Sequence, residues 1–198
     1  MSDVSQTSPD TRPGLVICAW APEDTPWDPV EDLSGEPWSP VGARTDPLPA
    51  DAPATLADAL IARLADPRRR ALLLVGPTRR TDRFHLQIRA ENRTEDGSGR
   101  LEGSGPAVVR STAPAAEMVQ ALREAGLAAE ATSEAEADAG SYLLYRVLSA
   151  LPDEADAPSV GLLRAPAGAS DDTIRRAVKV AAQAMARHLS PLPRPRPL

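Results

Sequence analysis

Residues 138–148 read DAGSYLLYRVL, a turn of small residues that runs directly into an amphipathic apolar stretch. This pattern predicts the start of a helix. Backbone N–H groups in the first turn of a helix lack partners and carry partial positive charge, which stabilises an anion such as a cysteine thiolate. Leu143 and Leu144 stand there instead. The segment is therefore either an ordinary buried helix or an active site without its nucleophile.

Apolar strands and amphipathic helices alternate on both sides of this helix. The expected strands are 14–20, 71–76, 83–92, 108–109, 127–132 and 159–165, and the other expected helices are 54–66, 114–125 and 170–188. Residues 21–53 are rich in proline and are expected to be irregular, apart from a turn of helix at 28–33. Residues 93–106 are expected to be a flexible loop. Strands separated by helices predict an α/β class: a single-domain α/β/α sandwich with a twisted, largely parallel central sheet.

The chain of 198 residues is long enough for one domain with its own core, and we expect that domain at 14–189. Residues 1–13 are polar and are expected to be disordered. The tail at 190–198 (SPLPRPRPL) cannot be helical. A disordered end is favoured there over a segment for a polyproline-binding partner.

Composition excludes several classes of function. A formal net charge of -6, with Lys179 the only lysine, provides no basic stripe for nucleic acid. One cysteine, Cys18, allows no intrachain disulfide, and two histidines, His85 and His188, form no metal-ligand cluster, so no cofactor is expected. The chain shows neither a signal peptide nor an apolar run of about 18 residues. We therefore expect a cytoplasmic protein without a membrane span.

Ligands of open α/β sheets bind at the carboxyl ends of the strands. Four positions in the chain therefore matter most for function. They are the strand ends at 19–22, 76–81 and 164–166 and the helix start at 138–142.

Segments at these positions resemble, in the same order, motifs of one enzyme family. Residues 18–23 (CAWAPE) resemble T-G-F-x-P-F, and 76–92 resemble G-Q-A-G-G-R followed at the same spacing by E-R-V-A-I-N. Residues 116–126 and 139–142 resemble the helix A-M-V-E-A-L-R-E-A-G and then A-G-x-Y-x-C-N, and 161–166 (GLLRAP) resemble G-F-I-H-V-P. These motifs mark a resemblance to the pyroglutamyl peptidase I (pyrrolidone-carboxylate peptidase) family. Its members are cysteine peptidases of phosphorylase/hydrolase-like fold that remove an N-terminal pyroglutamate.

The resemblance implies that the peptidase chemistry has been lost. It places the family's nucleophilic cysteine on Leu144, its histidine base on Arg164 and its supporting glutamate on Gln87. A three-residue deletion after Tyr142 is an alternative alignment, and it also removes the cysteine. Leucine has no nucleophilic atom, arginine stays protonated with a pKa above about 12, and glutamine lacks the charge that stabilises an imidazolium.

The resemblance also indicates a changed pocket, with four candidate ligand-binding residues: Trp20, Glu23, Arg79 and Arg164. Trp20 keeps the family's aromatic residue, whereas Glu23 replaces an aromatic residue and Arg79 replaces a glycine. Arg164 is expected to face the start of the 138–148 helix. The cleft is therefore predicted to bind a small anionic ligand or a peptide terminus. The rival interpretation is that Arg164 pairs internally with Glu23 or Glu91.

Three functions remain open at this point. The first is a pseudoenzyme that binds a small anion, a peptide terminus or a protein partner. The second is an enzyme recruited to chemistry that needs no nucleophile, such as a cyclisation in a biosynthetic pathway. The third is a residual hydrolase that uses Cys18 with His85, which shares a strand face with Gln87. Against it, Cys18 is more simply a small buried hydrophobe and His85 a half-exposed strand histidine. The sequence does not predict an oligomeric state.

Overall fold

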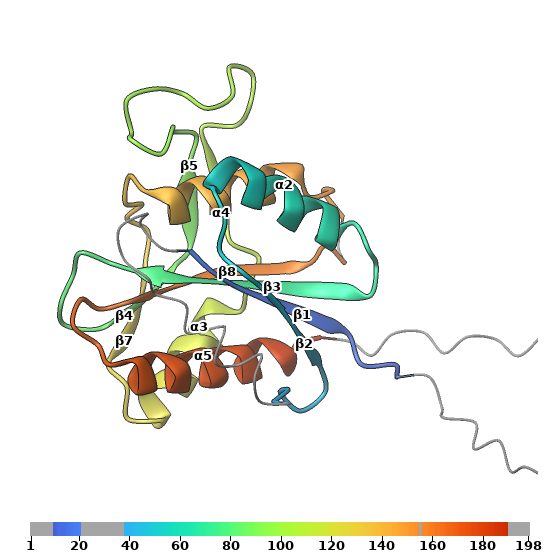
Figure 1. Cartoon of the computed structure of the whole chain (residues 1–198), viewed down its shortest axis with the longest axis vertical. Helices are drawn as coiled ribbons and strands as arrows, with labels where there is room; N and C mark the ends of the chain where they lie inside the picture. The colour runs from blue at the N-terminus through green and yellow to red at the C-terminus, as the bar shows by residue number, and fades with distance from the viewer. Residues whose placement is uncertain (1–9, 21–37, 155, 190–198) are drawn as a thin grey trace, which may run out of the picture.

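The computed structural model describes residues 10–20, 38–154 and 156–189. A six-stranded sheet in the order β2-β1-β3-β8-β4-β7 lies between α2 and α4 on one face and α3 and α5 on the other (Figure 1). β2, β1, β3 and β8 run parallel to one another, and β4 and β7 run antiparallel to these four. The elements are β1 (Gly14–Ala19), β2 (Arg44–Leu48), α2 (Pro53–Leu64), β3 (Arg69–Pro77), β4 (Phe84–Gln87), β5 (Arg89–Glu91), β6 (Val108–Arg110), α3 (Ala115–Glu124), β7 (Ala129–Thr132), α4 (Ala139–Ala150), β8 (Ser159–Ala165) and α5 (Asp171–Ala186). The predicted α/β sandwich is confirmed.

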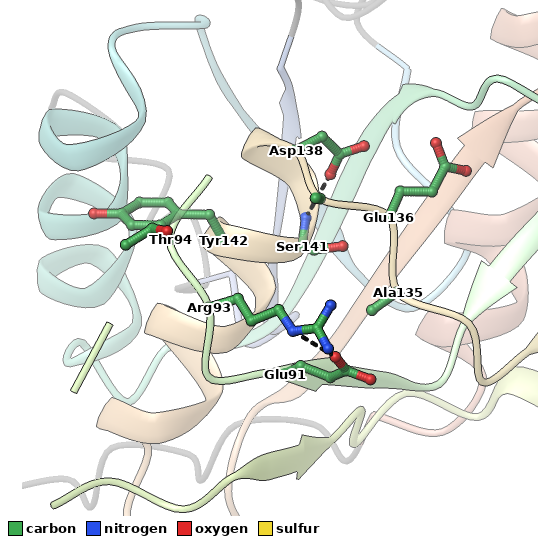
Figure 2. Close-up of a pocket in the computed structure, with 9 residues that line it drawn as sticks. Glu91, Arg93, Thr94, Ala135, Glu136, Asp138, Ser141 and Tyr142 are labelled. Atoms are coloured by element: carbon green, nitrogen blue, oxygen red, sulfur yellow. Dashed lines mark hydrogen bonds and ion pairs between the residues drawn. The ribbon is translucent and has the colours of Figure 1, made fainter. Parts of the chain in front are cut away.

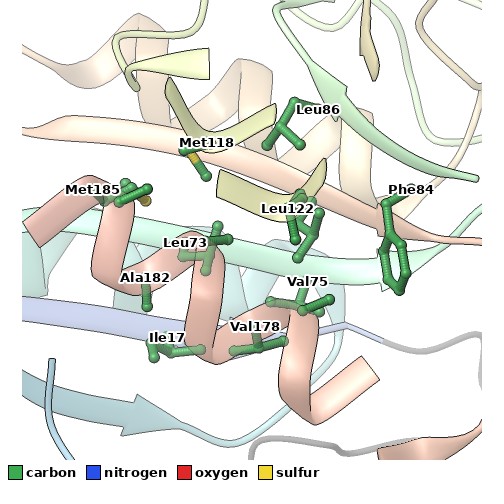
Figure 3. Packing of buried hydrophobic residues seen from close by; sticks show 14 of the residues in the cluster. Ile17, Leu73, Val75, Phe84, Leu86, Met118, Leu122, Val178, Ala182 and Met185 are labelled. Atoms are coloured by element: carbon green, nitrogen blue, oxygen red, sulfur yellow. The ribbon is translucent and has the colours of Figure 1, made fainter. Parts of the chain in front are cut away.

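The core has two halves, one on each face of the sheet. Central strands are covered on both faces, so they are continuous apolar runs, and every residue of β1 is buried. Side chains alternate between the faces along each strand. Figure 3 shows the α3/α5 side, where strand residues meet helix residues: Ile17, Leu73, Val75, Phe84 and Leu86 against Met118, Leu122, Val178, Ala182 and Met185. The other half packs β1, β3 and β8 against α2 and α4.

One strand lies where an irregular segment is expected. β2 pairs with β1 in parallel register, with Pro47 opposite Ile17. The expectation for 21–53 is wrong at 44–48, because proline is tolerated on an edge strand, where its missing N–H leaves no ladder bond unmade. The turn of helix predicted at 28–33 lies outside the described residues.

The expected strand at 83–92 is two strands in two different sheets. The backbone N–H of Ile88 donates to the carbonyl oxygen of Thr132, the last residue of β7. The carbonyl oxygen of Ile88 accepts from the N–H of Ser111, directly after β6. At Ile88 the chain therefore leaves the main sheet, and β5 continues as an antiparallel pair with β6. This break places Gln87 at the carboxyl end of β4 and brings β5 against α4.

The Asn92 side chain holds the middle of the loop at 93–106. Asn92 Oδ1 accepts from the backbone N–H groups of Leu101 and Glu102, at 3.0 and 2.8 Å. Its Nδ2 donates to the carbonyl oxygen of Glu102 at 2.8 Å.

Among the described residues, none of the helices combines the length and apolar character needed to cross a bilayer.

Candidate functional site

Arg164, near the carboxyl end of β8, is only 1% exposed, yet its guanidinium is fully hydrogen-bonded. Such a group has five N–H donors. The acceptors are Gln87 Oε1 at 2.8 Å from Nε, Asp138 Oδ2 at 2.7 Å and Pro77 O at 3.2 Å from Nη1, and Asp138 Oδ1 and Ser141 Oγ, both at 2.9 Å from Nη2. Each donor therefore has a partner. We call Arg164, Asp138, Gln87 and Ser141 the Arg164 cluster.

Asp138 is both the ion-pair partner of Arg164 and the N-cap of α4. Its Oδ1 accepts from the backbone N–H of Ser141 at 2.9 Å (Figure 2), as a capping side chain does. The two carboxylate oxygens also face the two terminal guanidinium nitrogens, a bidentate arrangement that is stronger than a single contact. One carboxylate therefore compensates the positive end of α4 and the buried arginine together.

Gln87 connects this ion pair to the neighbouring strands. Its Nε2 donates to Arg89 O at 2.7 Å and to Ser141 Oγ at 3.1 Å, while its Oε1 accepts from Arg164. The amide thus supplies one acceptor and two donors in a fully buried position. The Arg164 cluster consequently joins the ends of β4 and β8 to the first turn of α4.

Trp20 covers the guanidinium. The centre of its ring lies 5.4 Å from Arg164 Cζ, a cation–π contact. The ring edge is wedged between Gly76 and Gly140: a Cβ at Gly76 would lie 2.1 Å from Trp20 Cε2, and one at Gly140 would lie 2.3 Å from Cζ2. Only glycine permits this approach of backbone to ring. The indole Nε1 has no hydrogen-bond partner within the described part of the chain.

Leu144, where the resemblance places the nucleophile, is a core residue. Leu143 and Leu144 are fully buried and pack in the half of the core that lies between the sheet and α2 and α4. The structure therefore brings Gln87 and Arg164 together as the resemblance implies, but the α4 residue that meets them is Ser141. At Leu143 and Leu144, α4 is an ordinary buried helix.

A small pocket with a volume of about 10 Å³ opens beside the Arg164 cluster (Figure 2). It is lined by Glu91, Arg93, Thr94, Ala135, Glu136, Ala137, Asp138, Ser141 and Tyr142. Glu91 pairs with Arg93, whose Nε lies 3.0 Å from its Oε2. Glu136 accepts hydrogen bonds from the hydroxyl of Thr78 and, at 3.4 Å, from the backbone N–H of Arg79. Asp138 is paired with Arg164 and Glu91 with Arg89 and Arg93, so Glu136 is the lining carboxylate whose described contacts are with neutral donors.

The predicted ligand-binding residues do not all lie in one place. Trp20 and Arg164 lie together, whereas Arg79 is exposed and contributes its backbone N–H to the contact with Glu136. Glu23 lies outside the described residues. The expectation that Arg164 is open to an anion from solution is wrong, because Arg164 pairs internally with Asp138. Glu91, the other described candidate, pairs instead with Arg89 and Arg93. Asp138 itself was missed, although an aspartate directly before a helix start is a signal for an N-cap.

Cys18 and His85, the pair considered for a residual hydrolase, are not assembled. Cys18 is buried on β1 and His85 on β4, and β3 and β8 lie between these strands. At the usual strand spacing the two backbones are about 14 Å apart. His85 is buried rather than half-exposed, and neither ring nitrogen makes a hydrogen bond in the described part of the chain. Its Nδ1 lies 3.4 Å from Glu130 Oε1, a contact that becomes an ion pair only when the imidazole is protonated. Burial lowers the pKa of its imidazole.

No group of three or more histidine, cysteine, aspartate or glutamate side chains positioned for a metal ion occurs among residues 10–20, 38–154 and 156–189. The site is thus a buried ion-pair cluster beside a polar pocket. Its described groups can hold and orient a charged ligand, but they do not include an imidazole in contact with a nucleophile.

Comparison with known proteins bears on the fold. No protein-family model matches the sequence, and no curated protein matches it significantly. Pyroglutamyl peptidase I from Bacillus amyloliquefaciens is similar in structure, with a TM-score of 0.78, 16% identity, and coverage of 89% of this chain and 96% of that chain. The pyrrolidone carboxyl peptidase from Thermococcus litoralis has a TM-score of 0.70 at 13% identity, with coverage of 89% of this chain and 94% of that chain. The enzyme from Thermus thermophilus has a TM-score of 0.71 at 18% identity, with coverage of 86% of this chain and 99% of that chain. The chain has the pyroglutamyl peptidase I fold.

Proposed function

We propose that this protein has no cysteine peptidase activity and acts as a binding protein on the pyroglutamyl peptidase I fold. One observation carries the proposal: Arg164, at the position that the resemblance gives to the histidine base, has all five N–H donors occupied. An arginine so engaged is a structural ion-pair partner. It stays protonated and cannot accept a proton from a nucleophile.

The other groups of the Arg164 cluster do not replace the lost chemistry. Ser141 has a hydroxyl at the first turn of α4, but its side-chain partners are Gln87 and Arg164, neither of which is a base. Leu144 has no nucleophilic atom. Loss of a nucleophile or a base alone costs on the order of 10⁶ in rate, and further losses add little because the groups act as a unit.

The pocket supports binding of the amino end of a peptide. Two of its lining residues contact strand ends: Asp138 contacts Arg164 near the carboxyl end of β8, and Glu136 contacts Thr78 directly after β3. Ligands of open α/β sheets bind in this region. Glu136 contacts a hydroxyl and a backbone N–H, so its negative charge is available to an ammonium group. Arg164 is already paired with the carboxylate of Asp138, which argues against an anionic ligand.

Peptidase activity is tested with a fluorogenic pyroglutamyl amide. We expect the wild-type protein to show no turnover above the buffer, while an active pyroglutamyl peptidase I in the same assay cleaves the substrate. Cys18→Ser is the matched variant, because Cys18 is the only thiol of the chain. Thiol-dependent cleavage that disappears in Cys18→Ser would contradict the proposal.

Binding is tested by calorimetric titration with a short peptide that has a free amino terminus and with its acetylated form. We expect only the free amine to bind. Glu136→Gln keeps the shape of the side chain and removes its charge, so it should weaken binding about threefold to tenfold. Equal heats for the free and acetylated peptides would reject an amine-binding pocket.

A further inference from the structure

We infer that Asp138 is an internal ligand: its carboxylate occupies an anion site formed by Arg164 and the first turn of α4, and thereby closes that site to carboxylates from solution. The effect of Asp138 on which ligands the pocket selects rests on the proposed binding function. The occupation of the anion site by Asp138 rests on the geometry of the contacts alone.

Three donors converge on the carboxylate. They are Arg164 Nη1 at 2.7 Å, Arg164 Nη2 at 2.9 Å and the backbone N–H of Ser141 at 2.9 Å. A guanidinium fork together with a helix N-terminus is an arrangement that binds carboxylates well. In this protein the anion is covalently attached, because it is the side chain of the residue that precedes α4.

The donors are held in place without Asp138. Gln87 Oε1 fixes Arg164 Nε, while Pro77 O and Ser141 Oγ each accept from one terminal nitrogen. Trp20 lies over the same guanidinium. Three of the five N–H groups therefore keep their partners when the carboxylate is removed, and the remaining two still point at the vacated place. A preorganised site of this kind loses little free energy to ordering when an anion binds.

A dissolved anion can reach this place from the pocket. The Asp138 side chain is 22% exposed and lines the pocket with Ser141, whereas Arg164 behind it is buried. An unpaired guanidinium is costly at such a depth, so a small carboxylate that replaces the missing one should stabilise the fold. Formate is the probe of choice because it is a carboxylate with no further side chain.

Two variants separate the loss of charge from the creation of space. Asp138→Ser removes the carboxylate, leaves room for formate and keeps a hydroxyl that can cap α4. Asp138→Asn removes the charge but fills the same volume, so it is the matched control. Thermal unfolding is followed with increasing formate at constant ionic strength, and formamide serves as the neutral comparison.

We expect about 100 mM formate to raise the Tm of Asp138→Ser by about 2–4 °C with saturation, and to leave wild type and Asp138→Asn within about 1 °C. If Asp138→Ser is unfolded in chloride, formate should restore its helical circular dichroism. An equal effect of formate on all three proteins, or no recovery of an unfolded Asp138→Ser, overturns the inference. Neither result depends on peptidase activity or on peptide binding, so failure of the proposed function would be recognised separately.

Discussion

Two buried polar groups lie opposite each other on neighbouring strands and differ in their hydrogen bonding. Arg164 on β8 and His85 on β4 are direct partners in the sheet. The arginine has five acceptors, whereas neither ring nitrogen of His85 is hydrogen-bonded within the described residues. A permanent charge is tolerated in a core only when it is paired and fully hydrogen-bonded, but an imidazole can stay neutral. The difference shows that the buried position of Arg164 requires a complete set of acceptors, whereas that of His85 does not.

Removing the carboxylate should have the largest effect, because it breaks the satisfied half of the comparison. Asp138→Ala leaves Arg164 buried without its counter-charge and removes the cap of α4. We expect the free energy of unfolding to fall by about 3–5 kcal/mol in urea denaturation. The double variant Asp138→Ala, Arg164→Met should lose less than Asp138→Ala alone. A double variant that is less stable than Asp138→Ala would contradict the assignment of the cost to an uncompensated charge.

Crowding the ring over Arg164 should have an intermediate effect. Gly140→Ala improves helix propensity by about 1 kcal/mol, but its Cβ would lie 2.3 Å from Trp20 Cζ2. We expect a net loss of about 1–3 kcal/mol in urea denaturation, because the ring must shift from the guanidinium. Trp20→Phe in the same background should recover part of the loss. A Gly140→Ala protein as stable as wild type would show that the ring has room to move.

Replacing His85 should change the stability little at neutral pH, where its imidazole is neutral and its 3.4 Å contact with Glu130 is not an ion pair. His85→Leu removes no hydrogen bond with a described residue and keeps a side chain of similar size, so we expect a change within about 1 kcal/mol. A loss of more than about 3 kcal/mol would instead indicate a hydrogen-bonded role for the imidazole.

Acid should then separate wild type from His85→Leu. Burial is the largest cause of the lowered pKa of His85; Arg80 and Arg83 lower it further, while Glu130 and Asp82 act in the opposite direction. As the pH falls, the imidazole of His85 is therefore protonated first in the unfolded chain, near pH 6.5, and only at lower pH in the folded protein. The stability contribution is complete above about pH 6.5 and is lost as the pH falls through the folded pKa. Urea midpoints measured from about pH 7.5 to about pH 5 should fall more steeply for wild type than for His85→Leu. Parallel curves would contradict a neutral buried imidazole.

An exposed ion pair should give the smallest effect and provides the scale for the others. Asp58 Oδ1 lies 3.1 Å from Arg146 Nη2, and the Asp58 side chain is largely in solvent. Asp58→Asn should change the free energy of unfolding by less than about 0.5 kcal/mol, because water screens the pair. A loss close to that of Asp138→Ala would mean that burial does not distinguish the two ion pairs.

Local sequence pattern was sufficient for much of the fold and for part of the site. Apolar runs and amphipathic periods located β1, β3, β8 and the helices, since these signals lie within one segment. β2 was missed because RTDPL has no apolar period; its neighbour β1 determines its conformation. The break at Ile88 was missed for the same reason, since it depends on partners in two sheets.

The pairing in the Arg164 cluster is a property of the sheet order. Asp138 and Arg164 are far apart in sequence, and they meet because β8 and α4 end and begin at the same edge of the sheet. The resemblance to a known family indicated Gln87 and Arg164, because it carries the geometry of another chain. It gave no reason to select Asp138, whose partner is a residue that the family's motif does not have.

The position of β8 also has a consequence for how the protein is made. β8 lies between β3 and β4, although both of these strands precede it in the chain. Until residues 159–165 have left the ribosome, β3 and β4 lack their shared neighbour, and each has an unpaired edge of N–H and C=O groups. The central sheet can therefore be completed only after its other five strands have been synthesised. The emerging chain passes through a stage in which apolar strand edges are open to other nascent chains or to a chaperone.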